Sequence, residues 1–266
     1  MNELNAAPMT DPSALVRPFT VAVFDSEIED LKQRLARTRW PNPETVSDWS
    51  QGVRLENARS LIDYWERDYD WRRFESELNR FPHFLTAIDG LDVHFIHVKS
   101  ANPSAMPLIL THGWPGSIVE LLKLIGPLTD PVAFGGGVED SFDVVIPSLP
   151  GFGFSGKPSE PGWDVTRIAH AWVAISLYWY TNSAVSSARI YWENGSASFA
   201  GPKLTLPVAV TVFPRDIPRL PRSWIEDTYT NLIHYGGADR GGHFAALEQP
   251  EILISEIRAG LRGLRS

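Results

Sequence analysis

The sequence predicts an α/β protein in which a helical arm precedes a core of short strands and helices. Two observations lead to this fold class. Apolar residues recur with a period of about 3.6 before Phe81 and with a period of about 2 directly after it. Beyond that point short apolar runs alternate with helical stretches, without internal repeats or low-complexity tracts. We therefore expect an arm of helices followed by one α/β core.

The arm carries the pattern of three amphipathic helices. Ser26, followed three residues later by Glu29, has the spacing of a capping box near the start of the first helix. The pair Trp40-Pro41 ends this helix, because a residue that precedes proline disfavours the helical conformation. The expected helices are 25–38, 53–66 and a third one through Trp71, Phe74 and Leu78.

The core begins with a predicted β-hairpin. Its turn is Asp89-Gly90, because an Asp-Gly pair supplies the positive φ angles that a tight turn needs. Later apolar runs suit buried parallel strands, with one helix at 118–128 and a closing helix at 250–264. The expected strands are 84–88 and 91–98 in the hairpin, then 107–111, 142–146, 207–213 and a short stretch at 232–235.

Composition excludes several classes of protein. The chain has 266 residues, of which 43% are hydrophobic, so it is long and apolar enough for a large buried core. No run approaches the roughly 18 apolar residues that identify a membrane span. The 24 Lys and Arg are scattered in a chain of net charge -8, so nucleic acid is not an expected partner.

Targeting and redox chemistry leave few signals. Residues 1–16 lack a basic segment followed by an apolar one, so we interpret them as a mobile tail and not as a signal peptide. Without cysteine there is no disulfide, no thiolate nucleophile and no zinc-thiolate site. We expect no metal and no cofactor, and the cytoplasm is the default location.

The stretch His112-Gly-Trp-Pro-Gly116 follows one strand and opens a helix. At such a junction main-chain N–H groups point outward with the positive end of the helix dipole, which suits the stabilisation of a developing oxyanion. An ordinary loop between a strand and a helix is the alternative interpretation.

Gly151, Gly153 and Gly156 match the G-x-G-x-x-G pattern of dinucleotide-binding proteins. That turn must run straight into a helix, whereas the stretch 157–161 contains two prolines and breaks one. We therefore do not expect nucleotide binding here.

His243 and Asp216 are the candidates for acid–base chemistry. Glycines precede His243 in a loop before the last helix, and imidazole suits proton transfer near neutral pH. Asp216 lies just past a strand and precedes His243 in the chain. A carboxylate followed by a histidine is the order of the acid and the base in α/β hydrolases. The alternatives are a surface-loop histidine and a turn aspartate before Pro218.

Tyr178, Tyr180 and Tyr191 lie in an aromatic stretch, 177–192. A tyrosine hydroxyl in a dry pocket could protonate a substrate oxygen as a bond breaks. Core packing is the alternative for aromatic residues at this density.

Five motifs, taken in order, resemble those of the microsomal and juvenile-hormone epoxide hydrolases, over residues 17–264. The resemblance implies an α/β-hydrolase fold whose N-terminal arm is the family's epoxide hydrolase N-terminal domain. The motifs are Arg17-Pro-Phe, His112-Gly-Trp-Pro-Gly-Ser117, Pro150-Gly-Phe-Gly-Phe-Ser155, Ser186-Ser-Ala-Arg-Ile-Tyr-Trp-Glu-Asn194 and Arg240-Gly-Gly-His-Phe-Ala-Ala246.

The resemblance also implies a two-step reaction on a small apolar epoxide. A nucleophilic aspartate forms an ester while tyrosines protonate the leaving oxygen, and water activated by histidine then hydrolyses the ester to a diol. It assigns Tyr191 as a proton donor, His243 as the general base and Asp216 as the acid that orients it. The oxyanion hole and pocket fall on His112, Gly113, Trp114 and Pro115. Animal members more often have Glu at the acid position, so Asp216 gives a shorter reach.

The chain departs from the family where the nucleophile should be. No Gly-x-Asp-x-Gly or Gly-x-Ser-x-Gly occurs in it, and 171–174 runs directly into a stretch that resembles the late lid. About a hundred residues are missing, judged from two strand–helix units and most of a lid. The third strand (107–111) and the seventh (207–213) must then pair directly or remain as open edges.

Three interpretations of function follow. The first is an epoxide hydrolase that is inactive or impaired because the nucleophile segment is absent. The second is a non-catalytic module that binds an apolar ligand or a partner. The third is a serine hydrolase, which the absence of a Gly-x-Ser-x-Gly motif disfavours. A homo-oligomer is left open. The expected domains are the tail 1–16, the arm 17–83, the first half of the core 84–174, the lid remnant 175–200 and the end of the core 201–266.

Overall fold

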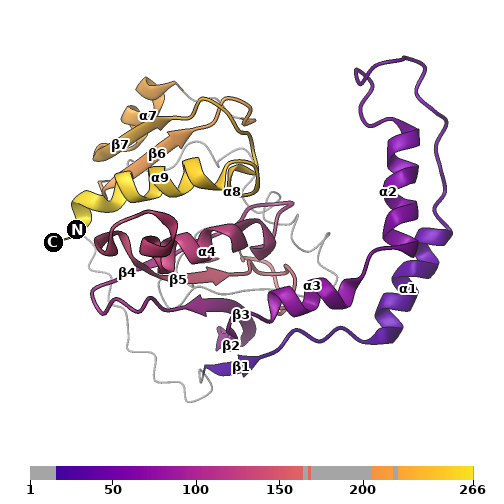
Figure 1. Ribbon diagram of the computed structural model, residues 1–266, viewed down its shortest axis with the longest axis horizontal. Helices are drawn as coiled ribbons and strands as arrows, with labels where there is room; N and C mark the ends of the chain where they lie inside the picture. Colours follow the sequence, from indigo (N-terminus) through magenta and orange to yellow (C-terminus); the bar gives the residue numbers. More distant parts are fainter. Residues whose placement is uncertain (1–15, 164–166, 169–204, 218–220, 266) are drawn as a thin grey trace. The chain divides into compact units, whose positions relative to one another are not determined.

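The computed structural model describes residues 16–163, 167–168, 205–217 and 221–265 (Figure 1). The chain divides into two compact units, which are the arm, Thr20–Phe81, and a core unit, Met1–Phe19 with Pro82–Ser266. The proposed tail, the lid remnant 175–200 and the three candidate tyrosines lie outside the described residues. The helices are α1 (Asp25–Ala36), α2 (Leu55–Arg67), α3 (Trp71–Leu78), η1 (Ile118–Leu121), α4 (Leu122–Thr129), η2 (Pro131–Phe134), η3 (Val138–Asp140), α7 (Arg222–Thr228), α8 (Ala245–Glu248), α9 (Pro250–Leu261) and η5 (Arg262–Leu264). The strands are β1 (Arg17–Phe19), β2 (His83–Ile88), β3 (Leu91–Val98), β4 (Met106–Ile109), β5 (Phe142–Pro147), β6 (Val208–Val212) and β7 (Leu232–Gly237).

The core unit contains a five-stranded sheet with the order β1-β2-β3-β5-β4. The hairpin β2–β3 turns at Asp89 and Gly90, whose φ angles are 48° and 77°, as the Asp-Gly pair predicts. Strands β3 and β5 are antiparallel, whereas β4 and β5 are parallel and are joined through η1 and α4. This is the predicted α/β arrangement.

A second sheet holds only β6 and β7, which run parallel to each other. The predicted third and seventh strands, now β4 and β6, therefore belong to different sheets in the described part of the chain. The sequence left two outcomes for these strands, direct pairing with each other or open edges. Direct pairing is wrong, and β4 and β6 each lie at the edge of their own sheet. Strand β4 is also less buried than predicted, because Ile109 is 45% exposed at the sheet edge.

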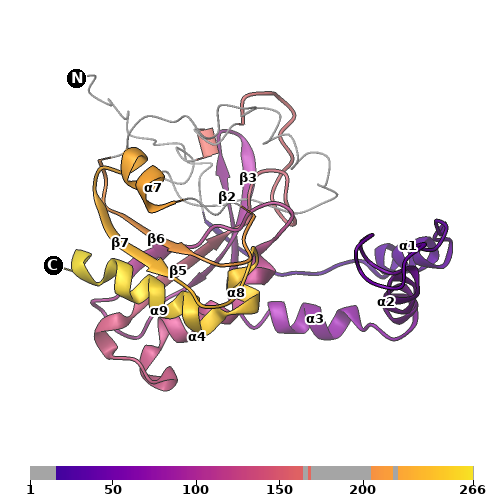
Figure 2. The same ribbon diagram turned by 90° about the horizontal axis from the view of Figure 1, so that it is seen from above.

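Helix α9 packs on both β6 and β7 and also on α4, which covers β5 (Figures 1 and 2). Leu124, Ile125 and Leu128 of α4 are completely or almost completely buried. A separate apolar cluster of Ile88, Val93 and Phe95 packs with residues of the loop after β5, among them Leu149 and Phe152. Burial of the cluster holds the loop at the carboxyl end of β5 in place.

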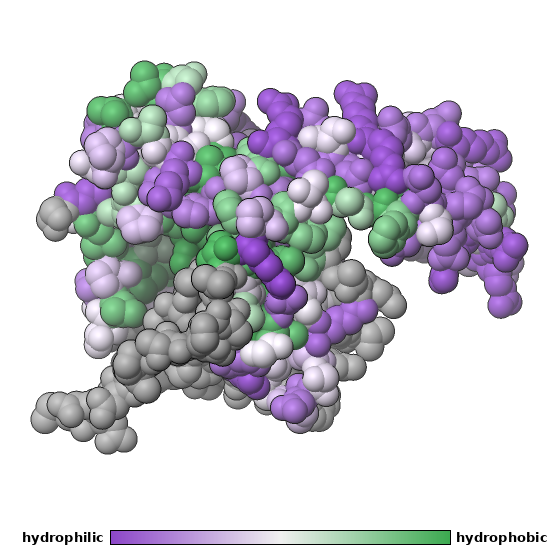
Figure 3. All heavy atoms as spheres, turned by 90° about the horizontal axis from the view of Figure 1, so that it is seen from below, coloured by the Kyte–Doolittle hydropathy of each residue, from purple (hydrophilic) through white to green (hydrophobic). Residues whose placement is uncertain are grey.

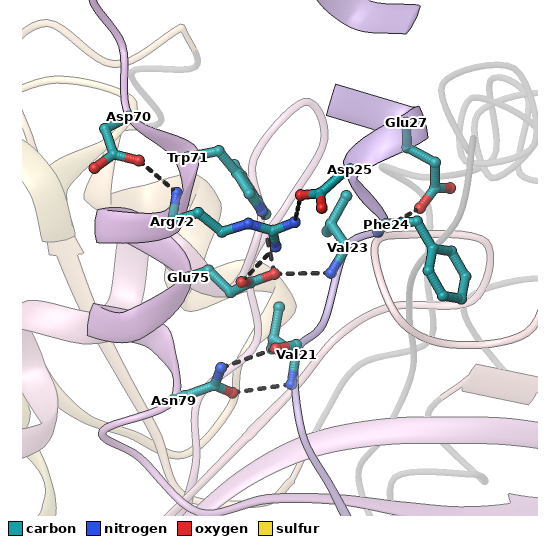
Figure 4. Close-up of polar contacts among 10 residues, drawn as sticks. All are labelled: Val21, Val23, Phe24, Asp25, Glu27, Asp70, Trp71, Arg72, Glu75 and Asn79. Carbon is teal, nitrogen blue, oxygen red and sulfur yellow. Dashed lines mark hydrogen bonds and ion pairs between the residues drawn. The ribbon is translucent and has the colours of Figure 1, made fainter. Parts of the chain in front are cut away.

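In the arm, α1 packs against α2, and α3 binds the extended segment that precedes α1. Figure 4 shows the side chains of Asn79 and Glu75 directed from α3 towards this segment. Asn79 accepts a hydrogen bond from the Val21 N–H at 2.9 Å and donates one to the Val21 carbonyl at 2.8 Å. Glu75 accepts a further one from the Val23 N–H at 2.7 Å.

The surface of the arm is mainly hydrophilic on the face drawn in Figure 3. On α2, Leu61 is 63% exposed and Tyr64 is 52% exposed. Every helix in the described ranges is too short or too polar to cross a lipid bilayer.

Candidate functional site

The candidate site lies where the loops at the carboxyl ends of β4, β6 and β7 meet. In sheets with parallel strands, ligands bind at these ends. The loop after β4 carries His112, Gly113 and Trp114, and those after β6 and β7 carry Asp216 and His243.

His112 holds its own loop to the loop that follows β5. Its buried imidazole donates through Nδ1 to the Gly113 carbonyl at 3.1 Å and accepts through Nε2 from the Leu149 N–H at 3.2 Å. Burial lowers the pKa of His112 to about 4, although the bond to Gly113 acts in the opposite direction. A neutral ring is also what this pattern of one donated and one accepted bond requires. His112 therefore supports the turn.

Asp216 and His243 are brought together as the sequence order predicts. His243 Nδ1 lies 3.0 Å from Asp216 Oδ1. This contact fixes the Nδ1–H tautomer in the neutral ring and leaves Nε2 as the nitrogen available to take a proton. The His243 side chain is 41% exposed, so water reaches it.

The parallel pairing of β6 and β7 continues into these two loops. Arg215 donates from its N–H to the Gly241 carbonyl at 3.0 Å and forms an isolated bridge with Gly242. Gly241 has a φ of 104°, and a Cβ there would lie 2.8 Å from the Phe213 ring. Glycine is therefore needed at this position for His243 to stand next to Asp216.

A pocket of about 220 Å³ opens beside this pair. Gly113 and Trp114 line it from the loop after β4, Glu120 from η1, and His243 and Phe244 from the loop after β7. Of the four residues predicted for the oxyanion hole and pocket, Gly113 and Trp114 line it. His112 and Pro115 lie in the same turn without lining it.

Sequence reasoning missed Glu120. Its Oε1 accepts a hydrogen bond from the Gly113 N–H at 3.3 Å, so a carboxylate lies in the pocket together with His243. The only signal for it in the sequence is a lone glutamate two residues after the predicted helix start, which does not reveal where the side chain points. Within the described ranges, no group of three His, Cys, Asp or Glu could hold a metal ion.

Comparison with known proteins identifies the family. The profile named "Epoxide hydrolase N terminus" matches residues 16–121. A protein of Stigmatella aurantiaca, named as a predicted epoxide hydrolase, is 38% identical to this chain and covers 94% of it, with 86% of its own length aligned. The chain belongs to the epoxide hydrolase family.

Other epoxide hydrolases extend this result. Epoxide hydrolase 1 of Sus scrofa is 26% identical over 91% of this chain and 88% of its own. The crystal structure of juvenile hormone epoxide hydrolase from the silkworm Bombyx mori superimposes with a TM-score of 0.79, at 21% identity, covering 95% of this chain and 94% of that one. The α/β-hydrolase fold is thereby confirmed.

The comparison also confirms an internal truncation. The alignment with the Stigmatella epoxide hydrolase runs over 377 positions, whereas this chain has only 266 residues. More than a hundred positions of this alignment are therefore occupied by the relative and have no residue of this chain opposite them. Strands β4 and β6 correspond to the third and seventh strands, between which the missing strands were expected in the sheet. In the described residues they lie in different sheets.

Proposed function

We propose that this chain is an impaired epoxide hydrolase, which keeps the water-activating half of the family's chemistry and lacks the ester-forming half. The observation that carries the proposal is the 3.0 Å contact between His243 and Asp216, next to a pocket lined by Gly113 and Trp114. The substrate class is a small apolar epoxide, which would be opened to a vicinal diol.

The retained residues perform the second step of such a reaction. Asp216 orients His243 through Nδ1 and stabilises the imidazolium that forms when Nε2 takes a proton from water. The turn at Gly113 and Trp114 is proposed to lie against the oxyanion of the intermediate, where the Gly113 N–H would have to leave Glu120 Oε1 in order to donate to it. Tyr191, which lies outside the described residues, is proposed as a proton donor to the leaving oxygen.

The first step has no residue to carry it out. The full sequence contains neither Gly-x-Asp-x-Gly nor Gly-x-Ser-x-Gly, so no carboxylate or hydroxyl is presented on a nucleophile elbow. Without an ester, His243 has no acyl group to release, and the rate gained from covalent catalysis is lost.

We predict that no ester intermediate forms. Intact-mass spectrometry of the chain mixed with styrene oxide should show only the unmodified mass, and chromatography should show diol formation far below that of a complete family member. A stoichiometric adduct on any aspartate would contradict the proposal. Binding of the epoxide with no turnover at all would favour the non-catalytic module.

A further inference from the structure

The carboxylate of Glu120 occupies a defined position in the pocket. Ser117 caps η1 by accepting the Val119 N–H, and η1 then presents Glu120 back towards the turn, where Oε1 meets the Gly113 N–H. Gly116 makes this possible, because a Cβ at that position would lie 2.4 Å from Glu120 Oε2. The turn and the carboxylate are therefore fitted to each other.

His243 reaches the same pocket from the other sheet. Its Nδ1 is engaged by Asp216, so Nε2 is the ring nitrogen left for chemistry. Glu120 and His243 both line a space of about 220 Å³, and they are close enough for the charge of the imidazolium to favour the carboxylate. A small apolar molecule and a water that entered this space would therefore meet both an acid and a base.

We propose that Glu120 and His243 act as an acid–base pair, which opens a small epoxide by direct attack of water, without a covalent intermediate. This inference rests on the proposed function, since it names the residues responsible for the slow turnover that an impaired hydrolase retains.

The step balances without another reactant. His243 Nε2 removes a proton from water while the water oxygen forms a bond to an epoxide carbon, and the carbon–oxygen bond of the ring breaks. The protonated carboxyl of Glu120 gives its proton to the oxygen that leaves, so that the product is a vicinal diol. The imidazolium of His243 then returns a proton to the Glu120 carboxylate through water, which restores both groups.

The surroundings of Glu120 favour the protonated form that an acid catalyst needs. Burial raises the pKa of the Glu120 carboxyl above its ordinary value of 4.5, although the Gly113 N–H and the charge of His243 act in the opposite direction. A raised carboxyl pKa keeps a larger fraction of the acid form at mildly acidic pH.

The test is a single turnover in ¹⁸O-labelled water, with the protein in excess over styrene oxide. Direct attack places ¹⁸O in the diol during the first turnover. An ester pathway instead gives an unlabelled diol, because its oxygen comes from an enzyme carboxylate. Epoxide binding is measured in parallel from the fluorescence of Trp114, as the difference between the wild type and Trp114→Phe.

Glu120→Gln separates an acid from a structural support. The amide oxygen of glutamine can still accept the Gly113 N–H, but it has no carboxyl proton to donate. We expect the residual rate to fall about a hundredfold or more, with binding unchanged, since general acid catalysis contributes about 10² to 10⁴. His243→Gln should cause a similar loss. The matched control is Glu226→Gln on α7, a half-exposed glutamate paired with Arg222, which should leave the rate unchanged.

The outcomes distinguish this inference from the proposed function. A labelled diol whose formation depends on both Glu120 and His243 supports the pair. An unlabelled diol, or full activity in Glu120→Gln, overturns it. Diol formation that depends on His243 but not on Glu120 overturns the pair and leaves the impaired hydrolase standing, whereas epoxide binding with no diol above the spontaneous rate overturns the pair and favours the non-catalytic module. Absence of both binding and turnover contradicts the proposed function itself.

Discussion

His243 and His112 have different surroundings, which suit them to different roles. His243 is exposed and oriented by a carboxylate, whereas His112 is 3% exposed and has both ring nitrogens engaged by main-chain groups. A charged imidazole at the position of His112 would lose the bond that Nε2 accepts from Leu149. His112, which the sequence motif includes, is thus a support for the turn, and the catalytic chemistry is proposed only for its neighbours.

We predict that His112 stays neutral down to about pH 4 in the folded chain. Because folding lowers its pKa from 6.5 to about 4, its contribution to stability is fully present above about pH 6.5. That contribution is lost as the pH falls from there through 4. Imidazole ¹⁵N chemical shifts recorded between about pH 7.5 and 5 should show mainly the neutral Nδ1–H tautomer, with the chain unfolded in urea as reference. Titration of His112 near 6.5 in the folded chain would contradict the assignment.

Sequence reasoning paired Asp216 with His243 because both follow strands, and chain order then determines which loops meet. Asp216 and His243 were predicted as a pair on this ground, and the structure places them 3.0 Å apart. Glu120 could not be found in the same way. Its role depends on the direction of a side chain in a turn of 3-10 helix and on the missing Cβ of Gly116, which only coordinates reveal. The assignment of Tyr191 stays a prediction.

At the scale of elements, local signals predicted the hairpin and the helices well and their ends less well. Asp89 and Gly90 form the predicted turn, since few other pairs adopt two successive positive φ angles. The capping box predicted at Ser26 and Glu29 is wrong. Helix α1 begins at Asp25, and Glu27 accepts the Phe24 N–H at 3.1 Å. The pair Phe24 and Glu27 has the same spacing as the predicted pair Ser26 and Glu29. The helix begins at Asp25, so the earlier pair forms the cap.

The extended segment before α1 depends on side chains of α3, which leads to a prediction within the arm. Asn79→Ala removes both partners of Val21, and an unsatisfied buried main-chain group costs about 1–3 kcal/mol. Hydrogen exchange in the full chain should show the Val21 amide exchanging about tenfold faster or more.

Glu77→Gln on the same helix is the control for this prediction. Its carboxylate is exposed and pairs with the neighbouring Arg80 side chain, so this substitution should leave the Val21 amide protected. Equal protection of Val21 in Asn79→Ala and the wild type would show that the main chain of this segment is held by other contacts.

At the scale of the whole molecule, the truncation changes how the core can be stabilised. The α/β-hydrolase sheet normally continues from the third strand to the seventh, whereas here β4 and β6 belong to separate sheets in the described residues. In the part of the chain that the structure describes, helix α9 packs on both the β6–β7 sheet and α4. Cooperativity between the two sheets then depends on this helix rather than on main-chain hydrogen bonds.

We therefore predict a protein with a broad, weakly cooperative thermal transition and an apolar surface that binds hydrophobic dyes. The edge at β4 makes the prediction specific, because Ile109 is 45% exposed there and an apolar sheet edge favours association between chains. Ile109→Lys should reduce aggregation, since a lysine on an edge strand disfavours pairing with another chain. It should leave the thermal transition as broad as before, because it does not join the two sheets.

Calorimetry, dye binding and light scattering on the purified chain measure these effects. The matched control is Val132→Lys in η2, which is 61% exposed and lies outside the strands, so it adds the same charge without changing an edge. Equal aggregation of the two lysine variants would show that β4 is not the site of association. A sharp, reversible two-state transition of the wild type would contradict the weakened core. It would mean that α9 and the remaining contacts couple the two sheets as fully as shared strands do.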